Sequence, residues 1–349
     1  MGRAGGALRS DRRHVRHGAA SRVEGDKLSR IFLLGATGAI GQATARALLA
    51  RGHDVVCFIR PRSNGEVTFE AFDGAEIRFG EAVDLDALAR DGFKGEAFDA
   101  VISCMASRTG APKDAWRVDY EAHTNVLSVA KDVGVRHFVL LSAICVQKPR
   151  LAFQQAKLAF EKELIASGLD YSIVQPTAFF KSLSGQVDRV MAGKSFLVFG
   201  DGRGTSVKPI SDGDLANYIV DCLDDPLLRN RILPIGGPGP ALTPREQGER
   251  LFELAGKPPR FTQVPLGFLD GVIGLLSTLG VVIPPLKDKA ELARIGRYYA
   301  SESMLVWDAE TDRYDAEATP STGTETLFDF YRALIAGETS VERGAHKVF

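Results

Sequence analysis

The chain has 349 residues, of which 45% are hydrophobic and 25% are charged, and this is the composition of a globular protein with ample length for a core. Its formal net charge of −1 excludes a strong basic field, so we predict no nucleic-acid partner. The four cysteines form no C-x-x-C pair and are interpreted as buried, reduced thiols rather than as a disulfide framework.

Residues 1–27 are rich in Arg, Gly and Ala and contain no apolar segment of the kind that a secretory signal needs. We predict a disordered tail here, with an organelle-targeting segment as the alternative. The folded part is predicted to begin at residue 28.

Short runs of Val, Ile and Leu alternate with helical segments between residues 28 and 178. The strand-like runs are Arg30–Gly35, Asp54–Ile59, Ala75–Phe79, Phe98–Ser103, His137–Ser142 and Tyr171–Pro176. Because continuous apolar strands are buried on both faces, they predict a parallel sheet that helices cover on both sides. The predicted fold class is therefore α/β, with a doubly wound parallel sheet of the Rossmann type in residues 28–178.

The pattern loosens in residues 179–349, a smaller mixed α/β portion that we expect to complete the sheet and to form the substrate pocket and a lid. The predicted elements are a helix at Ser211–Leu223 with Ser at its N-cap, a strand at Arg231–Gly237, a helix at Thr243–Gly256 with a capping box, and a helix at Thr324–Ala336.

One segment of this portion, Leu266–Leu286, is strongly apolar and is about long enough to span a bilayer. It also contains Asp270 and a pair of prolines. We therefore predict two short buried or lid-like helices. A patch that contacts a membrane surface is the second choice, and a membrane span is the third.

The motif GATGAIG holds Gly35, Gly38 and Gly41 and stands between the first strand and the first helix. In this context the first Gly allows a tight turn, the second lets the backbone approach a pyrophosphate, and the third lets the helix pack closely on the strand. The free N–H groups of the helix N-terminus also favour phosphates. We predict a dinucleotide site in this turn, with Thr37 and Ile40 as further members.

The second strand is followed by Arg60, Arg62 and Ser63, where an NAD site usually places an acid. Guanidinium groups bind a 2′-phosphate through charge-assisted hydrogen bonds, so the cofactor is predicted to be NADPH. Further cofactor contacts are expected where the later strands end, at Glu81, Cys104, Ala106, Pro176, Thr177 and Phe179.

Ser142 ends the fifth strand and Lys157 lies on the next helix. Both are predicted to contact the cofactor, and they are the candidate catalytic residues. Many nicotinamide-dependent reductases carry Tyr-x-x-x-Lys on this helix, but here Phe153 stands four residues before Lys157. Phenylalanine cannot donate a proton to an alkoxide, so a plain ketone substrate is disfavoured. A conjugated C=C bond is favoured, because hydride addition leaves a carbanion that a large π-system delocalises.

The proton donor for such a reaction stays open on the sequence alone. The alternatives are Ser142, Lys157, Tyr299 and Cys145.

Four stretches of the chain resemble the divinyl chlorophyllide a 8-vinyl-reductase family, an atypical branch of the short-chain dehydrogenase/reductase superfamily. They are HFVLLSAICVQKPRLAFQQAKLAFE (His137–Glu161), PTAFFKSLSGQV (Pro176–Val187), LPIGGPGPALTPREQGE (Leu233–Glu249) and IGRYYASESMLVWD (Ile295–Asp308). The resemblance implies an NADPH-dependent oxidoreductase of chlorophyll or bacteriochlorophyll biosynthesis. It would reduce the C8 vinyl group of divinyl chlorophyllide or protochlorophyllide to ethyl. That family also has Phe at the position of Phe153.

The same resemblance implies a flat, apolar, conjugated substrate that carries a carboxylate, which aromatic and basic side chains would suit. The expected substrate contacts are Phe180, Lys181, Arg108 and Tyr299. The magnesium ion belongs to the substrate, and no protein metal site is predicted. We expect a cytoplasmic protein that contacts photosynthetic membranes peripherally, or a plastid protein if the host is eukaryotic. The oligomeric state stays open.

Two other functions remain as alternatives. One is another NADPH-dependent reductase, of the isoflavone-reductase type. The other is a non-catalytic protein that binds NADP as a sensor, which the missing hydroxyl at Phe153 favours.

Overall fold

The computed structural model describes residues 28–61, 72–283 and 285–341. The predicted tail at residues 1–27 and the predicted phosphate contacts Arg62 and Ser63 lie outside the described residues. Seven strands form one parallel sheet in the order β3-β2-β1-β4-β5-β6-β8. They are β1 (Arg30–Leu34), β2 (Asp54–Ile59), β3 (Glu76–Phe79), β4 (Ala100–Ser103), β5 (His137–Leu141), β6 (Asp170–Pro176) and β8 (Arg231–Ile235). The predicted α/β class with a doubly wound parallel sheet is confirmed.

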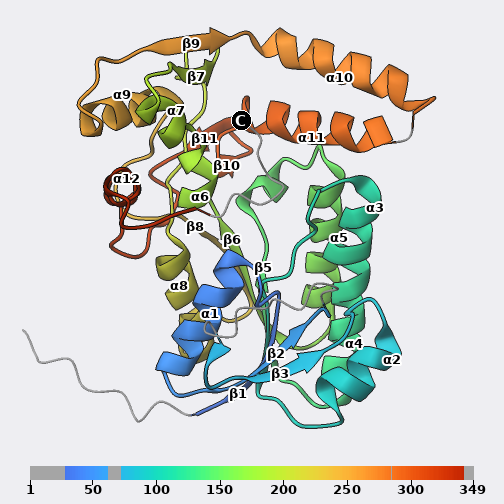
Figure 1. Cartoon of the computed structure of the whole chain (residues 1–349). Helices are drawn as coiled ribbons and strands as arrows, with labels where there is room; N and C mark the ends of the chain where they lie inside the picture. The colour runs from blue at the N-terminus through green and yellow to red at the C-terminus, as the bar shows by residue number, and fades with distance from the viewer. Residues whose placement is uncertain (1–27, 62–71, 284, 342–349) are drawn as a thin grey trace, which may run out of the picture.

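Helices cover both faces of this sheet (Figure 1). One face carries α1 (Ala39–Ala50) and α8 (Asp212–Asp224), and the other carries α4 (His123–Asp132) and α5 (Ala152–Ala166). The strand order reverses between β1 and β4. In doubly wound sheets, ligands bind beyond the carboxyl ends of the strands at this reversal. The carboxyl edge of β1, β4, β5 and β6 is therefore where the site is sought.

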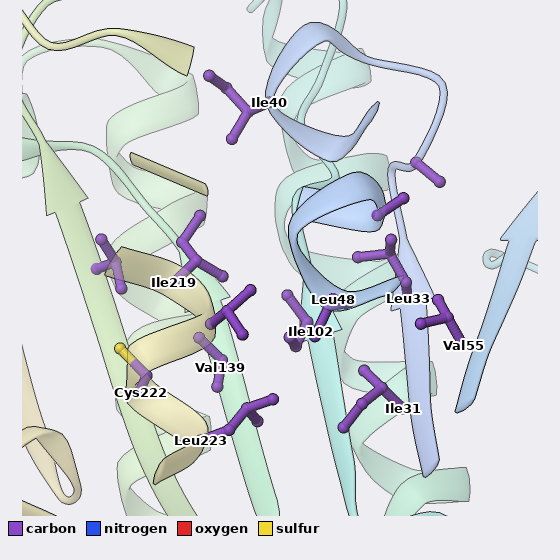
Figure 2. Close-up of a cluster of buried hydrophobic side chains, with 14 of the residues drawn as sticks. Ile31, Leu33, Ile40, Leu48, Val55, Ile102, Val139, Ile219, Cys222 and Leu223 are labelled. Atoms are coloured by element: carbon purple, nitrogen blue, oxygen red, sulfur yellow. The ribbon is translucent and has the colours of Figure 1, made fainter. Parts of the chain in front are cut away.

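Side chains of the central strands β1, β2, β4, β5 and β6 alternate between two apolar cores. Ile31 and Leu33 pack toward α1 and α8, whereas Phe32 and Leu34 pack toward α4 and α5. Figure 2 shows the first of these cores, where residues of the strands meet Leu48 of α1 and others from α8. Because both faces are buried, the strands are apolar throughout, which is the pattern that the sequence displays.

The C-terminal portion contains a second, two-stranded parallel sheet of β7 (Phe196–Phe199) and β9 (Phe261–Val264). The predicted capping box of α9 (Pro244–Leu254) is present, and Thr243 is its N-cap. The predicted N-cap Ser211 of α8 also accepts a hydrogen bond from the Asp214 N–H. The terminal helix α12 (Leu327–Ala336) begins three residues later than predicted, because Thr326 caps it.

The prediction of two short buried or lid-like helices within Leu266–Leu286 is wrong in the number of helices and in their burial. One helix, α10 (Leu266–Gly280), fills most of the segment, and α11 (Pro285–Tyr299) is a separate helix that packs beside it (Figure 1). Only one side of α10 is covered, so Phe268 and Leu275 are 63% and 62% exposed. Among the residues that the structure describes, no helix is long and apolar enough to cross a membrane.

The remaining elements are short. They are α2 (Leu85–Ala87), η2 (Leu88–Phe93), α3 (Pro112–Ala115), η3 (Trp116–Ala122), η4 (Ile144–Gln147), α6 (Phe180–Leu183), η5 (Ser184–Gln186), α7 (Val187–Met191), η6 (Pro226–Leu228), β10 (Val306–Asp308) and β11 (Arg313–Asp315).

Candidate functional site

The glycine turn between β1 and α1 is packed as tightly as a dinucleotide site requires. A Cβ atom on Gly35, whose φ is +72°, would lie 2.4 Å from the backbone carbon of Cys104, and one on Gly41 would lie 2.1 Å from the Gly35 oxygen. A Cβ atom on Gly38 would meet nothing nearer than 3.4 Å. The fold itself therefore requires the first and third glycines, and the second is free to face a ligand.

The N-terminus of α1 fits a phosphate group. Its N-cap is Gly38, which is exposed and which provides no side chain to bond the first N–H groups of the helix. These donors and the helix dipole favour an anion. Thr37 and Ile40 flank Gly38 in the same turn, with Ile40 9% exposed.

The other predicted cofactor residues lie at the carboxyl ends of four strands. Arg60 follows β2 and is exposed, and Glu81, shortly after β3, is half-buried. Cys104 follows β4, with its Sγ atom 3.6 Å from the Thr44 hydroxyl of α1, and Ala106 is exposed in the same loop. These positions surround the glycine turn along one edge of the sheet.

Pro176 and Thr177 end β6 in buried positions. The Thr177 hydroxyl donates to the carbonyl oxygen of Lys208, so it fastens the C-terminal portion to the sheet. Phe179 is half-buried and packs against the core of α1 and α8.

Lys157 is 8% exposed and does not extend into solvent. Its Nζ atom lies 3.1 Å from Oδ1 of Asp119, whose side chain is fully buried. Removing one partner of a buried ion pair leaves an uncompensated charge in the interior, which is strongly unfavourable. Asp119 is thus a functional candidate that the sequence alone did not reveal.

Ser142 is 5% exposed, and its hydroxyl donates to Glu161 on α5. The Gln175 amide donates to both oxygens of the same carboxylate at 3.1 Å. Burial raises the pKa of Glu161, although its hydrogen bonds and Lys157 act in the opposite direction. Ser142 therefore belongs to a buried polar group inside the sheet–helix interface.

Ser103 of β4 and His123 of α4 are also buried and polar. The Nε2 atom of His123 lies 2.8 Å from the Ser103 hydroxyl, and its Nδ1 atom lies 2.9 Å from the Val118 carbonyl oxygen. Burial, with a smaller contribution from Lys157, lowers the pKa of His123 to about 4. The imidazole is consequently neutral near pH 7.

The buried polar layer is defined as Ser103, Asp119, His123, Ser142, Lys157, Glu161 and Gln175. Helical periodicity predicts part of this layer. Lys157 and Glu161 are one turn apart on the same face of α5 as the apolar Phe160. The partners Asp119 and His123 come from a distant stretch of chain, and their pairing cannot be read from local spacing.

Phe153 is half-buried in an apolar cluster around η4 and α11. A Cβ atom on Gly110 would lie 2.8 Å from Ile295 of α11 and 3.6 Å from the Phe153 ring, so α11 lies over this end of α5. One turn beyond Ile295, the Tyr299 hydroxyl lies 3.8 Å from Sγ of Cys145. A phenol from α11 is thus present in the region where the helix α5 carries none.

The neighbouring residues Tyr298 and Cys145 of this cluster are buried. Tyr298 donates to the carbonyl oxygens of Cys145 and Lys148, at 3.0 and 3.1 Å. Cys145 itself is 4% exposed, and burial raises the pKa of its thiol.

The predicted substrate contacts separate into two groups. Arg108, Lys181 and Tyr299 are exposed, Tyr299 by 44%. Phe180 is only 4% exposed and packs against Phe330 of α12, with ring centroids 5.6 Å apart. The structure places Phe180 in the apolar core of the C-terminal portion, with Val187 and Phe196. Over the described ranges, no three His, Cys, Asp or Glu side chains form a cluster that could hold a metal ion.

Comparisons with known proteins agree with this arrangement. A family model described as NAD(P)H-binding matches residues 35–226. The chain is 48% identical to divinyl chlorophyllide a 8-vinyl-reductase, chloroplastic, of Cucumis sativus over 94% of this chain and 81% of that protein. It is 49% identical to the enzyme of the same name from Oryza sativa subsp. indica, over 91% of this chain and 82% of the relative.

Among solved structures, the binary complex of leucoanthocyanidin reductase with NADPH from Vitis vinifera has a TM-score of 0.64 at 17% identity, over 88% of this chain and 99% of that one. This likeness shows a shared fold. Nearly half of the residues match the plant reductases along almost the whole chain, and a nicotinamide-binding sheet underlies that match. The chain belongs to the divinyl chlorophyllide a 8-vinyl-reductase family.

Proposed function

We propose that this protein reduces the C8 vinyl group of divinyl chlorophyllide or protochlorophyllide to an ethyl group, with NADPH, in chlorophyll or bacteriochlorophyll biosynthesis. The observation that carries the proposal is the pairing of a complete dinucleotide turn with Phe153, four residues before Lys157. This combination suits a C=C bond conjugated to a large π-system. The family to which the chain belongs names the corresponding substrate.

In this proposal NADPH would bind at the carboxyl edge of the sheet. The N–H groups at Gly38 would hold the pyrophosphate, Arg60 with Arg62 and Ser63 would hold the 2′-phosphate, and Lys157 would hold the hydroxyls of the nicotinamide ribose. When bound, NADPH supplies the hydride for the reduction. The protein has to orient the substrate and to deliver a proton to it.

Tyr299 is the proton donor that fits best among the four sequence candidates. The Ser142 hydroxyl is bonded to Glu161, Lys157 is paired with Asp119, and the Cys145 thiol is buried. The Tyr299 side chain is 44% exposed, whereas none of the other three is more than 8% exposed. Desolvation of its hydroxyl raises its pKa well above the usual range. The phenol therefore stays protonated and can give its proton to the reduced side chain, after which solvent restores it.

The conjugated ring system relaxes the demand on this donor. The electron pair left by hydride addition spreads over the macrocycle, so the proton need not arrive at the same moment. Tyr299→Phe is expected to lower kcat about tenfold, less than the 10²–10⁴-fold typical of a general acid. Unchanged kcat in a variant that still binds NADPH would remove Tyr299 from the mechanism.

The substrate face is proposed to include Tyr299 and the basic residues Arg108 and Lys181. An exposed guanidinium or ammonium can pair with the carboxylate of a chlorophyllide. The helix α11 lies over the carboxyl edge of the sheet (Figure 1), so it would cover one side of the flat ring.

We also propose that the outer side of α10 contacts the surface of a photosynthetic membrane. Its exposed apolar residues continue into Val281 and Val282, which are 76% and 83% exposed. The exposed Lys287 and Lys289 follow on α11. An apolar patch beside basic residues suits an anionic lipid surface.

The reduction can be followed directly in the visible spectrum. Purified protein, NADPH and divinyl chlorophyllide are expected to give a product whose Soret band lies to the blue of the substrate band. An unchanged spectrum with folded protein that binds NADPH would contradict the proposed function. It would favour the non-catalytic NADP-binding alternative.

A further inference from the structure

Asp119 lies in a π-helical segment, η3, between the α-helical segments α3 and α4. Such segments contain an additional residue per turn and are frequent at functional sites. Asp119 and Ala122 are the buried residues of η3, while Trp116 at its start is 42% exposed. The segment therefore presents a charged side chain to the protein interior.

The Asp119 carboxylate contacts two segments that carry predicted cofactor residues, which are α5 and the loop after β4. Its Oδ1 atom lies 3.1 Å from Nζ of Lys157 and accepts the Ser107 N–H at 3.2 Å. Ser107 is in the loop after β4, beside Ala106. The single carboxylate oxygen thus connects α5 with the loop that follows β4.

The other oxygen of Asp119 is buried and has no hydrogen-bond partner among the described residues. Because a buried carboxylate with a free oxygen is unfavourable, this ion pair is a poor device for stability alone. An apolar pair of similar volume would usually serve as well. The arrangement is better explained by what it does to Lys157.

We propose that Asp119 is a positioning residue, which holds the Lys157 ammonium and the loop after β4 in the arrangement that binds the nicotinamide ribose of NADPH. This inference rests on the proposed role of Lys157. It is independent of the tetrapyrrole, so it can be tested by cofactor binding alone.

The first test measures the Kd for NADPH by nicotinamide fluorescence, without tetrapyrrole. Asp119→Asn keeps the shape of the side chain and removes its charge, and we expect Kd to rise about tenfold, as for loss of one charge-assisted contact. Glu291→Gln is the matched control, since it neutralises a carboxylate that is only 6% exposed and that pairs with Arg294 on α11 instead. Its Kd should stay within about twofold of the wild-type value.

The second test asks whether Asp119 acts through Lys157. In the Lys157→Met background, Asp119→Asn should change Kd by less than about twofold, because the partner that it positions is already missing. A tenfold rise in both backgrounds would overturn the positioning role. A wild-type Kd for folded Asp119→Asn would overturn it as well.

A third variant covers the case in which Asp119→Asn does not fold. The double replacement Asp119→Leu with Lys157→Met removes both buried charges and is expected to fold. It should bind NADPH about tenfold more weakly than the wild type. Wild-type affinity in this variant would show that the ion pair contributes nothing to cofactor binding. If the variants change the Kd for NADPH as expected but the wild-type protein does not reduce the vinyl group, the result would instead count against the proposed function.

Discussion

The glycine turn and the buried polar layer lie at the same edge of the sheet, but different forces determine them. In the turn, backbone atoms of Gly35, Gly41 and Cys104 approach so closely that any side chain would collide. In the polar layer, side chains from β4, β6, α4, α5 and η3, together with Ser142 after β5, pair through charges and hydrogen bonds. A short motif therefore specifies the first, whereas only the tertiary fold brings the second together.

The largest expected effect comes from filling the turn. Gly41→Val should cost about 4 kcal/mol or more of unfolding free energy, because its Cβ would lie 2.1 Å from a backbone oxygen that cannot move freely. Urea denaturation measures this. Gly38→Ala is the control, because its nearest neighbour is at 3.4 Å. We expect near-native stability and weaker NADPH binding for Gly38→Ala. Near-native stability of Gly41→Val would contradict the prediction.

The corresponding change in the polar layer is Lys157→Ala. It leaves the Asp119 carboxylate buried and unpaired, so unfolding free energy should fall by about 3–5 kcal/mol. Activity and NADPH binding should fall with it. Stability close to wild type would mean that Asp119 becomes protonated or solvated at little cost, and the layer would then be less dependent on charge than we infer.

The pH dependence of stability sharpens the same contrast. Burial lowers the pKa of His123 to about 4 from 6.5, so the folded state binds fewer protons than the unfolded state between these values. This stabilising contribution is complete above pH 6.5 and is lost as pH falls toward 4, by about 3 kcal/mol. Burial also lowers the pKa of His137 to about 4, which adds a loss in the same window.

Urea denaturation at pH 7 and pH 5 tests this prediction with His123→Asn, which should lose less stability on acidification than the wild type. An equal loss in both proteins would show that His123 does not carry the effect.

A smaller effect is expected at the cofactor phosphate. Arg60→Asp should raise the KM for NADPH more than tenfold, which corresponds to a charge-assisted contact worth about 1.5–3 kcal/mol. Arg136→Asp is a control at the opposite edge of the sheet, where Arg136 pairs with Asp99. An unchanged KM in Arg60→Asp would remove Arg60 from the phosphate site.

The smallest effect on stability is expected at the surface of α10. Phe268→Ser changes a side chain that is 63% exposed, so unfolding free energy should change by less than about 0.5 kcal/mol. Its sedimentation with anionic lipid vesicles should nevertheless decrease. Sedimentation equal to that of the wild type would contradict the proposed membrane contact.

The fold was largely predictable because its signals are local. Apolar runs marked β1, β2 and β5, and the capping residues Ser211 and Thr243 marked two helices. The prediction for Leu266–Leu286 is wrong because composition shows how apolar a segment is, but it does not show whether other elements cover it. An apolar helix is equally compatible with burial in the core and with a surface that contacts a membrane or another protein.

The site was predictable to a lesser extent. Lys157 was found from its spacing after Phe153, but its counter-ion Asp119 comes from a π-helical segment 38 positions earlier in the chain, which no periodic pattern predicts. Ser142 directly follows β5, and its hydroxyl donates to Glu161. Assigning a side chain to a face requires the register of the whole sheet.

The most direct test of the central claim follows the hydrogen atoms. With NADPH carrying deuterium at the transferable C4 position and divinyl chlorophyllide in ordinary water, the product should contain one deuterium in its C8 ethyl group by mass spectrometry and NMR. Deuterium at another position of the macrocycle, or a reduced product without deuterium, would contradict the account.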